Sequence, residues 1–359
     1  MKKLFALILA LVMVLSLVAC GGGAKEEPKA EEPKAEEPKA EEPKTEEPAA
    51  EKVVMKFAGT AAADPNNGEY VAMMKFEELV EEYSNGSIDV ELYPASQLGS
   101  SVEFTEGVSL GTVECGMAGF DGLAVYAPSM YAFSMPYQYN SIEEMRSVIE
   151  GETECRAAID EALSEINMKI VGVMYRPFRV VANAKQSVTD PASLKGVSLR
   201  VPDAACSQAI LGSMGAVTAT ISWGEVYTSI DQGVIDGCEN AITEIVSNNI
   251  HETVDYIAET RHMSAGIPIF VAEDWFNGLT QEQQDAIIKA GEDTTEFRYQ
   301  EVAKETEACW KECEEMGIEV KYYDDIDVEA FKAATADVYK DFIAQGYFTE
   351  EFYQATLVK

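Results

Sequence analysis

The chain has 359 residues, of which 47% are hydrophobic, and a formal net charge of −36 at pH 7. Its 63 acidic and 27 basic residues argue against binding to nucleic acid or to an anionic membrane surface, because phosphate contacts need clustered lysine and arginine. The same charge would repel an anionic solute at long range. A ligand that is an acid would therefore have to be held by arginines buried in the protein.

The N-terminal residues predict export and lipidation. Lys2 and Lys3 precede an apolar stretch, 4–19, that is shorter than the roughly 20 residues a transmembrane helix needs. Leu17-Val18-Ala19-Cys20 is typical of a lipoprotein cleavage site, with a small residue before the cysteine. We therefore expect a signal peptide at 1–19. Cys20 would become the lipidated first residue, and several acyl chains would anchor it to the cell membrane.

Residues 20–52 are expected to form a tether between this anchor and the folded part. Five pentads from Glu26 to Ala50 follow the pattern EEPKA, and each contains a proline. Proline blocks helix propagation, and the tract has no large apolar side chain to bury. A semi-extended chain at about 3 Å per residue would let the folded part stand clear of the membrane.

The remaining cysteines do not suggest a framework of disulfides. An even number in an exported protein invites that interpretation, but a domain of about 300 residues does not need staples. With only two histidines in the chain, no metal site is predicted. Free buried thiols are favoured for Cys115, Cys155, Cys206, Cys238, Cys309 and Cys313.

From residue 53 onward, strand and helix patterns alternate. Strands are predicted at 53–58, 88–92, 112–117, 170–174 and 197–201, with helices at 68–83 and 101–110 and another opening at the capping box Ser141 to Glu144. This alternation predicts the α/β class, with largely parallel sheets and helices on both faces. The length is sufficient for two lobes with a core each.

A long helix is predicted towards the C-terminus. Thr280 and Gln283 form a capping box, and helical composition continues to Gly317. At 1.5 Å per residue such a helix would extend about 50 Å and could run along both lobes. Two successive helices broken near Gly291 are the alternative.

Arg200 is the leading candidate for binding a ligand. It alternates with Leu199 and Val201, and Pro202 ends the strand directly after it. Ligands of open α/β sheets bind at the carboxyl ends of strands. A guanidinium there can hold a carboxylate through two parallel charge-assisted hydrogen bonds. An arginine on a solvated strand end is the alternative.

Three further residues complete the candidate site. Arg179 could supply a second guanidinium, with Arg176 as its competitor and a salt bridge to a nearby acid as the alternative for either. Trp223 could wall a pocket or simply pack in the core. Asn240 offers amide donors and an acceptor, although asparagine is also frequent in turns for local reasons.

The motifs around these residues, taken in order, resemble the solute-binding subunits of tripartite ATP-independent periplasmic (TRAP) transporters. The matching segments are Tyr93 to Gly99, Gly107 to Gly111, Leu199 to Pro202, Trp223 to Tyr227, Gly233 to Asn240 and Asp274 to Leu279. The resemblance implies two α/β lobes that close on the ligand, with a long helix spanning both. It implies lobe I at 53–177 plus 266–305 and lobe II at 178–265 plus 306–359.

The resemblance also implies roles for the site residues. Arg200 would form the salt bridge with the ligand carboxylate, and Arg179, Trp223 and Asn240 would complete the site. Cys238 and Ala241 stand where the family usually has glutamine and proline. The first-lobe wall around Thr60, Ser101 and 119–120 lacks a charged side chain of sialic-acid-binding relatives, so a smaller or flatter carboxylate is expected.

These observations together predict an extracytoplasmic lipoprotein that captures a small organic acid and delivers it to the membrane subunits of a TRAP permease, without a cofactor. An enzyme is disfavoured, because neither histidine lies in a nucleophile-bearing motif and no Gly-x-Ser-x-Gly or phosphate loop occurs. A ligand-sensing module that signals through a membrane partner is the alternative function, since the same pocket would serve it.

Overall fold

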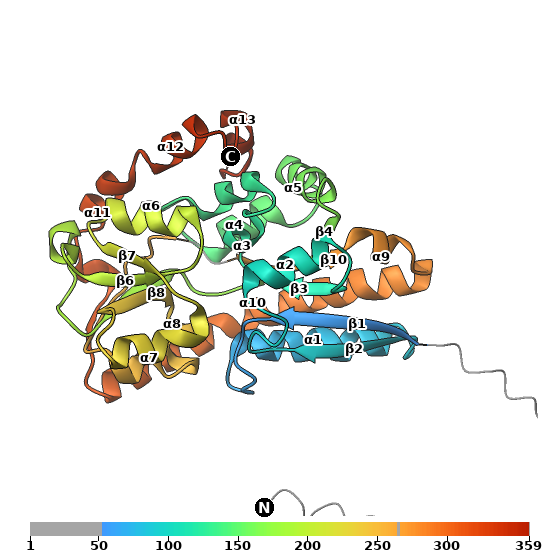
Figure 1. Ribbon diagram of the computed structural model, residues 1–359, viewed down its shortest axis with the longest axis horizontal. Coiled ribbons are helices and arrows are strands. Elements are labelled where there is room, and N and C mark those ends of the chain that lie inside the picture. Colours follow the sequence, from blue (N-terminus) through green and yellow to red (C-terminus); the bar gives the residue numbers. More distant parts are fainter. Residues whose placement is uncertain (1–51, 264–265, 359) are drawn as a thin grey trace, which may run out of the picture. The chain divides into compact units, whose positions relative to one another are not determined.

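The computed structural model of the protein describes residues 52–263 and 266–358 (Figure 1). The predicted signal peptide, Cys20 and all of the tether except Lys52 lie outside the described residues. Within the described part, none of the helices combines the length and the apolar character that crossing a membrane would require.

Two separate sheets organise the described residues. The first sheet has five strands in the order β2 (Ile88–Tyr93), β1 (Val53–Gly59), β3 (Cys115–Met117), β10 (Gly266–Ala272) and β4 (Met168–Tyr175). The second has six strands in the order β11 (Glu319–Lys321), β9 (Tyr256–Ala258), β5 (Arg179–Asn183), β8 (Gly237–Ala241), β6 (Ser198–Val201) and β7 (Val217–Thr220). The α/β class is confirmed, and we call the two sheets with their helices lobe I and lobe II.

The prediction of largely parallel sheets is wrong, because both sheets are mixed. β1 pairs in parallel with β2 and β3, and β6 with β7 and β8, as expected of strands joined through helices. However, β10 runs antiparallel to β3 and β4, and β5 runs antiparallel to β8 and β9. Among the described residues, no helix separates β4 from β5 or β9 from β10. The chain passes between the lobes at these two places, so the alternation of strand and helix is interrupted there.

The long C-terminal helix is confirmed as one continuous element, α10 (Gln281–Glu315). Its N-terminus has the expected reciprocal capping box between Thr280 and Gln283. It packs against α1 (Gly68–Tyr83) and β4 of lobe I and against α8 (Ile242–Ser247) of lobe II. In Figure 1 it extends in orange from beside lobe I to beneath lobe II.

Gly291 does not break α10, contrary to the alternative of two helices. It lies where the helix backbone touches strand β4, and an added Cβ would lie 1.9 Å from the Val171 carbonyl oxygen. Gly172, on that strand, faces the Gly291 backbone in the same way, with an added Cβ 2.8 Å from the Gly291 carbonyl oxygen. Both positions therefore need glycine so that helix and strand can approach closely.

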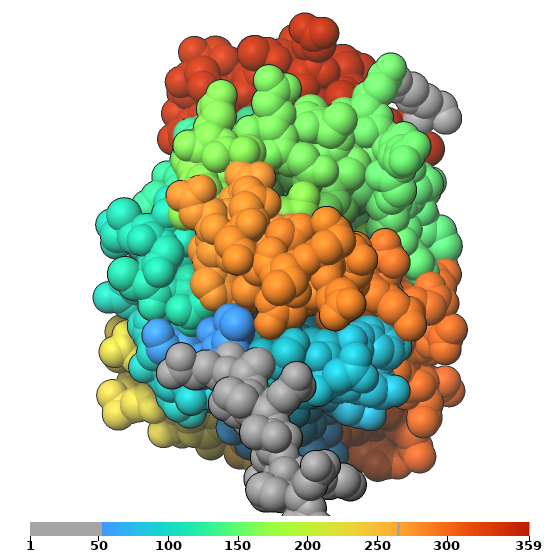
Figure 2. Space-filling model, turned by 90° about the vertical axis from the view of Figure 1, so that its right-hand side faces the viewer, coloured from blue at the N-terminus to red at the C-terminus, as the bar shows by residue number. Residues whose placement is uncertain are grey.

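The remaining helices cover the two sheets. Lobe I carries α2 (Ser101–Ser109), α3 (Phe120–Leu123), α4 (Ile142–Ile149), α5 (Glu154–Ser164) and α9 (Glu273–Asn277). Lobe II carries α6 (Ala205–Ser213) and α7 (Val226–Asp231), and the chain ends in α11 (Val328–Thr335), α12 (Val338–Ala344) and α13 (Glu350–Ala355). Figure 2 shows α9 and the start of α10 in orange between the green of α5 and the blue of α1, so segments distant in sequence share one face.

Three apolar cores hold these elements together. Between the first sheet, α1 and α10, the rings of Phe57 and Phe76 meet edge to face with centroids 5.4 Å apart. A second core lies under α7 and α8 of lobe II. The third continues from lobe I to α6 and the C-terminal helices, where α11 and α12 pack on α6 while α13 packs on α5.

Candidate ligand-binding site

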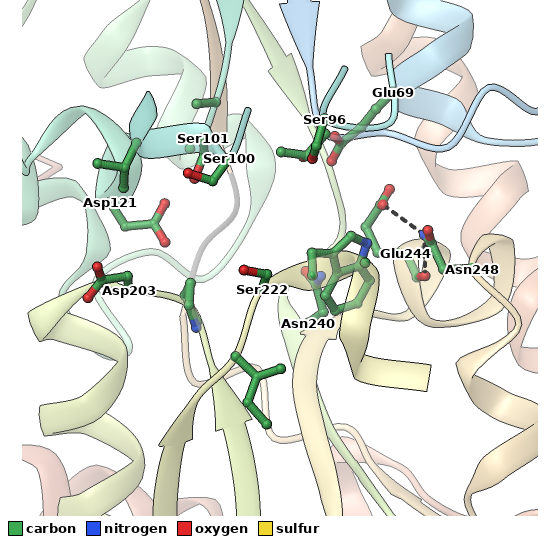
Figure 3. A pocket seen from close by; sticks show the side chains of 18 of the residues that line it. Glu69, Ser96, Ser100, Ser101, Asp121, Asp203, Ser222, Asn240, Glu244 and Asn248 are labelled. Carbon is green, nitrogen blue, oxygen red and sulfur yellow. Dashed lines mark hydrogen bonds between the residues drawn. The ribbon is translucent and has the colours of Figure 1, made fainter. Parts of the chain in front are cut away.

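A cavity of about 930 Å³ lies between the two lobes (Figure 3). Its lining comes from the carboxyl ends of four strands, where Thr60 follows β1, Met117 ends β3, Pro202 follows β6 and Thr220 ends β7. This is where open α/β sheets bind ligands, and the volume is within the range of small-molecule pockets. The four residues predicted for the site, Arg179, Arg200, Trp223 and Asn240, all line this cavity.

Arg200 lies near the end of β6 with 5% of its surface exposed. Its Nε donates a hydrogen bond of 2.7 Å to the Ile221 carbonyl oxygen, which orients the guanidinium. No acidic residue of the described part of the chain forms an ion pair with it. Burial lowers the pKa of Arg200 to about 10, because the charged form has lost its water, and the attraction of Glu239 offsets this only in part. A carboxylate in the cavity would supply that missing anion.

Trp223 and Asn240 lie on the same lobe as Arg200. The Trp223 ring, in the short 3₁₀ turn Trp223–Glu225, has its centroid 5.2 Å from the Arg200 guanidinium carbon. Asn240 lies inside strand β8 and is buried, and its Oδ1 accepts from the Ala241 backbone N–H over 2.9 Å. With the oxygen used locally, the Asn240 amide NH₂ is the part that can serve a ligand.

Ser222 directly precedes the Trp223–Glu225 turn but does not cap it. Its side chain makes no capping hydrogen bond, and it lines the cavity instead. Figure 3 shows Ser222 beside Asn240 on the lobe II wall.

Arg179 is neutralised within the protein. It begins β5, which runs antiparallel to β8 in a register that pairs Arg179 with Ala241, so Glu239 is its diagonal neighbour. The guanidinium pairs with both Glu239 carboxylate oxygens, through Nε and through Nη2 at 2.7 Å, and Nη2 also donates to the Glu239 carbonyl oxygen at 3.1 Å. His262 Nε2 lies 3.4 Å from the same carboxylate.

The Glu239 pKa reports the strength of this arrangement. Burial alone would raise the pKa, but the charge of Arg179, the nearby His262 ring and the hydrogen bonds from Arg179 outweigh it and lower the value to about 2. Both members of the pair are therefore ionised at neutral pH. Because the Glu239 carboxylate neutralises the Arg179 guanidinium, Arg179 would attract a ligand carboxylate only weakly.

Arg176, the competitor of Arg179, is also paired. Its Nη1 lies 2.6 Å from Glu69 Oε1 in the first turn of α1. The sequence analysis gave a salt bridge to a nearby acid as the alternative role for Arg176 and Arg179, and the structure shows such a salt bridge for each. Of the three arginines that line the cavity, Arg200 is the one without an acidic partner among the described residues.

Sequence reasoning missed much of the polar lining. Figure 3 shows the labelled side chains Glu69, Ser96, Ser100, Ser101 and Asp121 on the lobe I wall and Asp203, Glu244 and Asn248 on the lobe II wall. The lobe I wall therefore carries the acids Glu69 and Asp121, which the sequence analysis did not name. Ser100 is the one of these lining residues that a local pattern marks, because its capping box with Glu103 begins α2 at the edge of the cavity. The others have no local signature.

Two α/β lobes around a polar cavity, with a buried arginine that has no acidic partner among the described residues, are the arrangement expected of a solute-binding protein. Residues 58–345 match the family model described as bacterial extracellular solute-binding protein, family 7. The chain belongs to this family. The TRAP resemblance noted from the sequence motifs is thereby confirmed.

Characterised relatives agree with the assignment. The C4-dicarboxylate-binding periplasmic protein DctP of Rhodobacter capsulatus is 28% identical over 80% of this chain and 92% of its own length. The crystal structure of a TRAP periplasmic solute-binding protein from Sulfitobacter sp. NAS-14.1, with bound β-D-galacturonate, has a TM-score of 0.78 and 26% identity, covering 84% of this chain and 98% of that one. A second, from Roseobacter denitrificans with bound L-galactonate, has a TM-score of 0.76 and 27% identity, covering 86% and 98%.

Proposed function

We propose that this protein captures a small carboxylic acid, with the ligand carboxylate on Arg200. The observation that carries the proposal is the buried Arg200 guanidinium, held by Ile221 and without an acidic partner in the described residues. Trp223 would wall the ligand and the Asn240 amide would donate to it. Arg179 is paired with Glu239 and would stabilise the second sheet. It would add positive potential to the cavity but would not be the main residue that binds the carboxylate.

The ligands of similar proteins support a carboxylate. The relatives named above bind a dicarboxylate, a galacturonate and a galactonate, and each of these carries a carboxylate group. Two of them are sugar acids, so acids of that size belong in a ligand screen beside the smaller or flatter ones that the sequence favoured. The ligand would leave chemically unchanged and pass to the membrane subunits of a TRAP permease, without a cofactor.

The cellular setting is part of the same proposal. We propose that 1–19 is removed on export, that Cys20 carries the lipid anchor, and that 20–52 is the tether. We also propose that the lobes divide at 53–177 with 266–305 and at 178–265 with 306–359. The exported relatives support an extracytoplasmic location.

Titration calorimetry with mono- and dicarboxylates, keto acids and sugar acids tests the proposal, and the best ligand is then measured on variants. Arg200→Gln should weaken binding by about 2–5 kcal/mol, or roughly 30-fold or more, because a buried carboxylate would lose its cation. Arg200→Lys should be intermediate, since it keeps the charge and loses the planar fork. Lys340→Gln, which removes an exposed cation on α12, is the control and should bind normally. Unchanged affinity in Arg200→Gln would exclude the proposed site.

A further inference from the structure

Two buried ionisable side chains of the cavity, Arg200 and Glu244, have no ion-pair partner among the described residues. Arg200 is a buried cation without an anion, as described above. On the lobe II wall, Glu244 of α8 is a buried carboxyl group that lines the same cavity, with 3% of its surface exposed. No lysine, arginine or histidine of the described residues forms an ion pair with Glu244, and Asn248 donates a long hydrogen bond of 3.4 Å to its carboxylate.

The cations nearest to Glu244 are already engaged. Arg176 pairs with Glu69, and Arg298 on α10 pairs with Glu305 through two hydrogen bonds of 2.5 and 2.6 Å. Arg176 therefore has Glu69 as its ion-pair partner, and Glu244 has none among the described residues. Figure 3 shows these two acids on the same side of the pocket, reaching it from opposite walls.

Charged Glu244 is costly in this setting. Burial and the neighbouring Glu69 raise the pKa of the Glu244 carboxyl, and Arg176 offsets this only in part. A buried carboxylate without a cation is unfavourable, whereas a cation brought by a ligand would remove that cost. The other acids of the cavity do not have this property, because Asp203 is exposed and Asp121 half-buried, so water solvates both.

We propose that the ligand is a zwitterion, an amino-bearing carboxylic acid whose carboxylate binds Arg200 and whose ammonium group binds Glu244. This inference rests on the proposed function and adds the second charged group of the ligand. Such a ligand supplies the missing anion at one place and the missing cation at the other. It has no net charge, so the net charge of −36 on the chain does not repel it at long range, as it would a simple acid.

Matched pairs of probes test the proposal without any mutation. The pairs are glucosaminate with gluconate, β-alanine with hydracrylate, γ-aminobutyrate with γ-hydroxybutyrate, and δ-aminovalerate with δ-hydroxyvalerate. They differ in one ammonium group against one hydroxyl and span a range of separations from the carboxylate. At least one ammonium member should bind about tenfold or more tightly than its partner, because a hydrogen bond between charged groups replaces a neutral one. If no ammonium member binds, or if none exceeds its hydroxyl partner, the proposal is overturned.

Variants assign the preference to Glu244. Glu244→Gln should weaken the ammonium member about tenfold or more and leave its hydroxyl partner within about threefold, so the preference disappears. Asp231→Asn, an exposed acid at the end of α7, removes the same charge elsewhere and should keep the preference. A preference that survives Glu244→Gln would also overturn the assignment.

The proposed function and this inference can fail separately. Arg200→Gln should weaken binding of both members of a pair roughly 30-fold or more, because both carry the carboxylate. If hydroxyl acids bind in an Arg200-dependent manner while ammonium acids do not, the carboxylate receptor stands and the zwitterion proposal falls.

Discussion

Arg179 and Arg200 show how neighbours decide what a buried arginine does. Both line the cavity and both are 5% exposed. Arg179 is held by Glu239 on the adjacent strand, whereas Arg200 has only the Ile221 carbonyl oxygen and the Trp223 ring. Under the proposed function, the Arg179–Glu239 pair would stabilise lobe II, and the Arg200 guanidinium would bind the ligand carboxylate.

The Arg179–Glu239 pair should make stability depend on acid pH. The folded-state pKa of Glu239, about 2, is below its ordinary value of 4.5. The stabilisation is therefore fully present above about pH 4.5 and is lost as the pH falls from there through about 2. The full effect is about 3 kcal/mol, from about 1.4 kcal/mol per pKa unit.

Urea unfolding of wild type and Glu239→Gln at pH 7 and pH 3 measures this effect. The variant should be less stable at pH 7, because Arg179 loses its partner. The difference in unfolding free energy between the two proteins should be about 2 kcal/mol smaller at pH 3 than at pH 7. At pH 3 the wild type has already lost part of the stabilisation that ionised Glu239 provides. A difference that does not change with pH would contradict the role given to this pair.

At the scale of elements, local signals predicted the helices well. Helix α1 has the predicted bounds, α2 begins at the predicted residue, and Thr280 caps α10 as expected. Capping and helical periodicity depend on residues within a few positions of one another, so the sequence carries them directly. The direction of β10 depends on which sheet the chain returns to, and no local pattern encodes that.

The contact between α10 and β4 gives a prediction for Gly291. Gly291→Ala should destabilise the protein by about 1–3 kcal/mol or more, because the new Cβ meets the Val171 carbonyl and the helix must move away. Gly212→Ala on α6 is the matched control, since an added Cβ there meets nothing within 4 Å. It should be neutral or stabilising by up to about 1 kcal/mol. Thermal unfolding of the two variants checks this, and equal stabilities would contradict the packing argument.

At the scale of the whole molecule, the two lobes bring the site together. Residues far apart in sequence meet near the cavity, as when Asn67, which caps the N-terminus of α1, donates to Ser247 of α8 over 2.9 Å. The resemblance of sequence motifs to the family predicted a site of Arg179, Arg200, Trp223 and Asn240, and all four residues line the cavity. Glu244, Asp121 and Asp203 escaped notice because nothing in their local sequence distinguishes them from surface acids.

The proposed anchor gives a prediction for the complete protein. Cys20→Ser should move the protein from the membrane fraction to the soluble fraction and abolish incorporation of labelled palmitate, because the thiol is the site of lipidation. Ligand affinity should be unchanged, since the proposed binding residues lie in the folded part from residue 53 onward. Cys309→Ser, on α10, is the control and should remain in the membrane fraction. Membrane retention of the Cys20→Ser protein would rule out the lipoprotein proposal.

The sequence by itself determined the α/β class, the capping box at which α10 begins, and the family. It also made Arg200 the leading candidate for binding the ligand. These follow from periodicity, caps and motifs that are contiguous in the chain. Only the tertiary structure decided that the sheets are mixed, that Arg179 and Arg176 are paired, and that Arg200 and Glu244 are the buried charges without ion-pair partners among the described residues. The physical reason is that the cost of a buried charge depends on its neighbours in space, and those neighbours come from elements up to 175 residues apart, as Glu69 and Glu244 do.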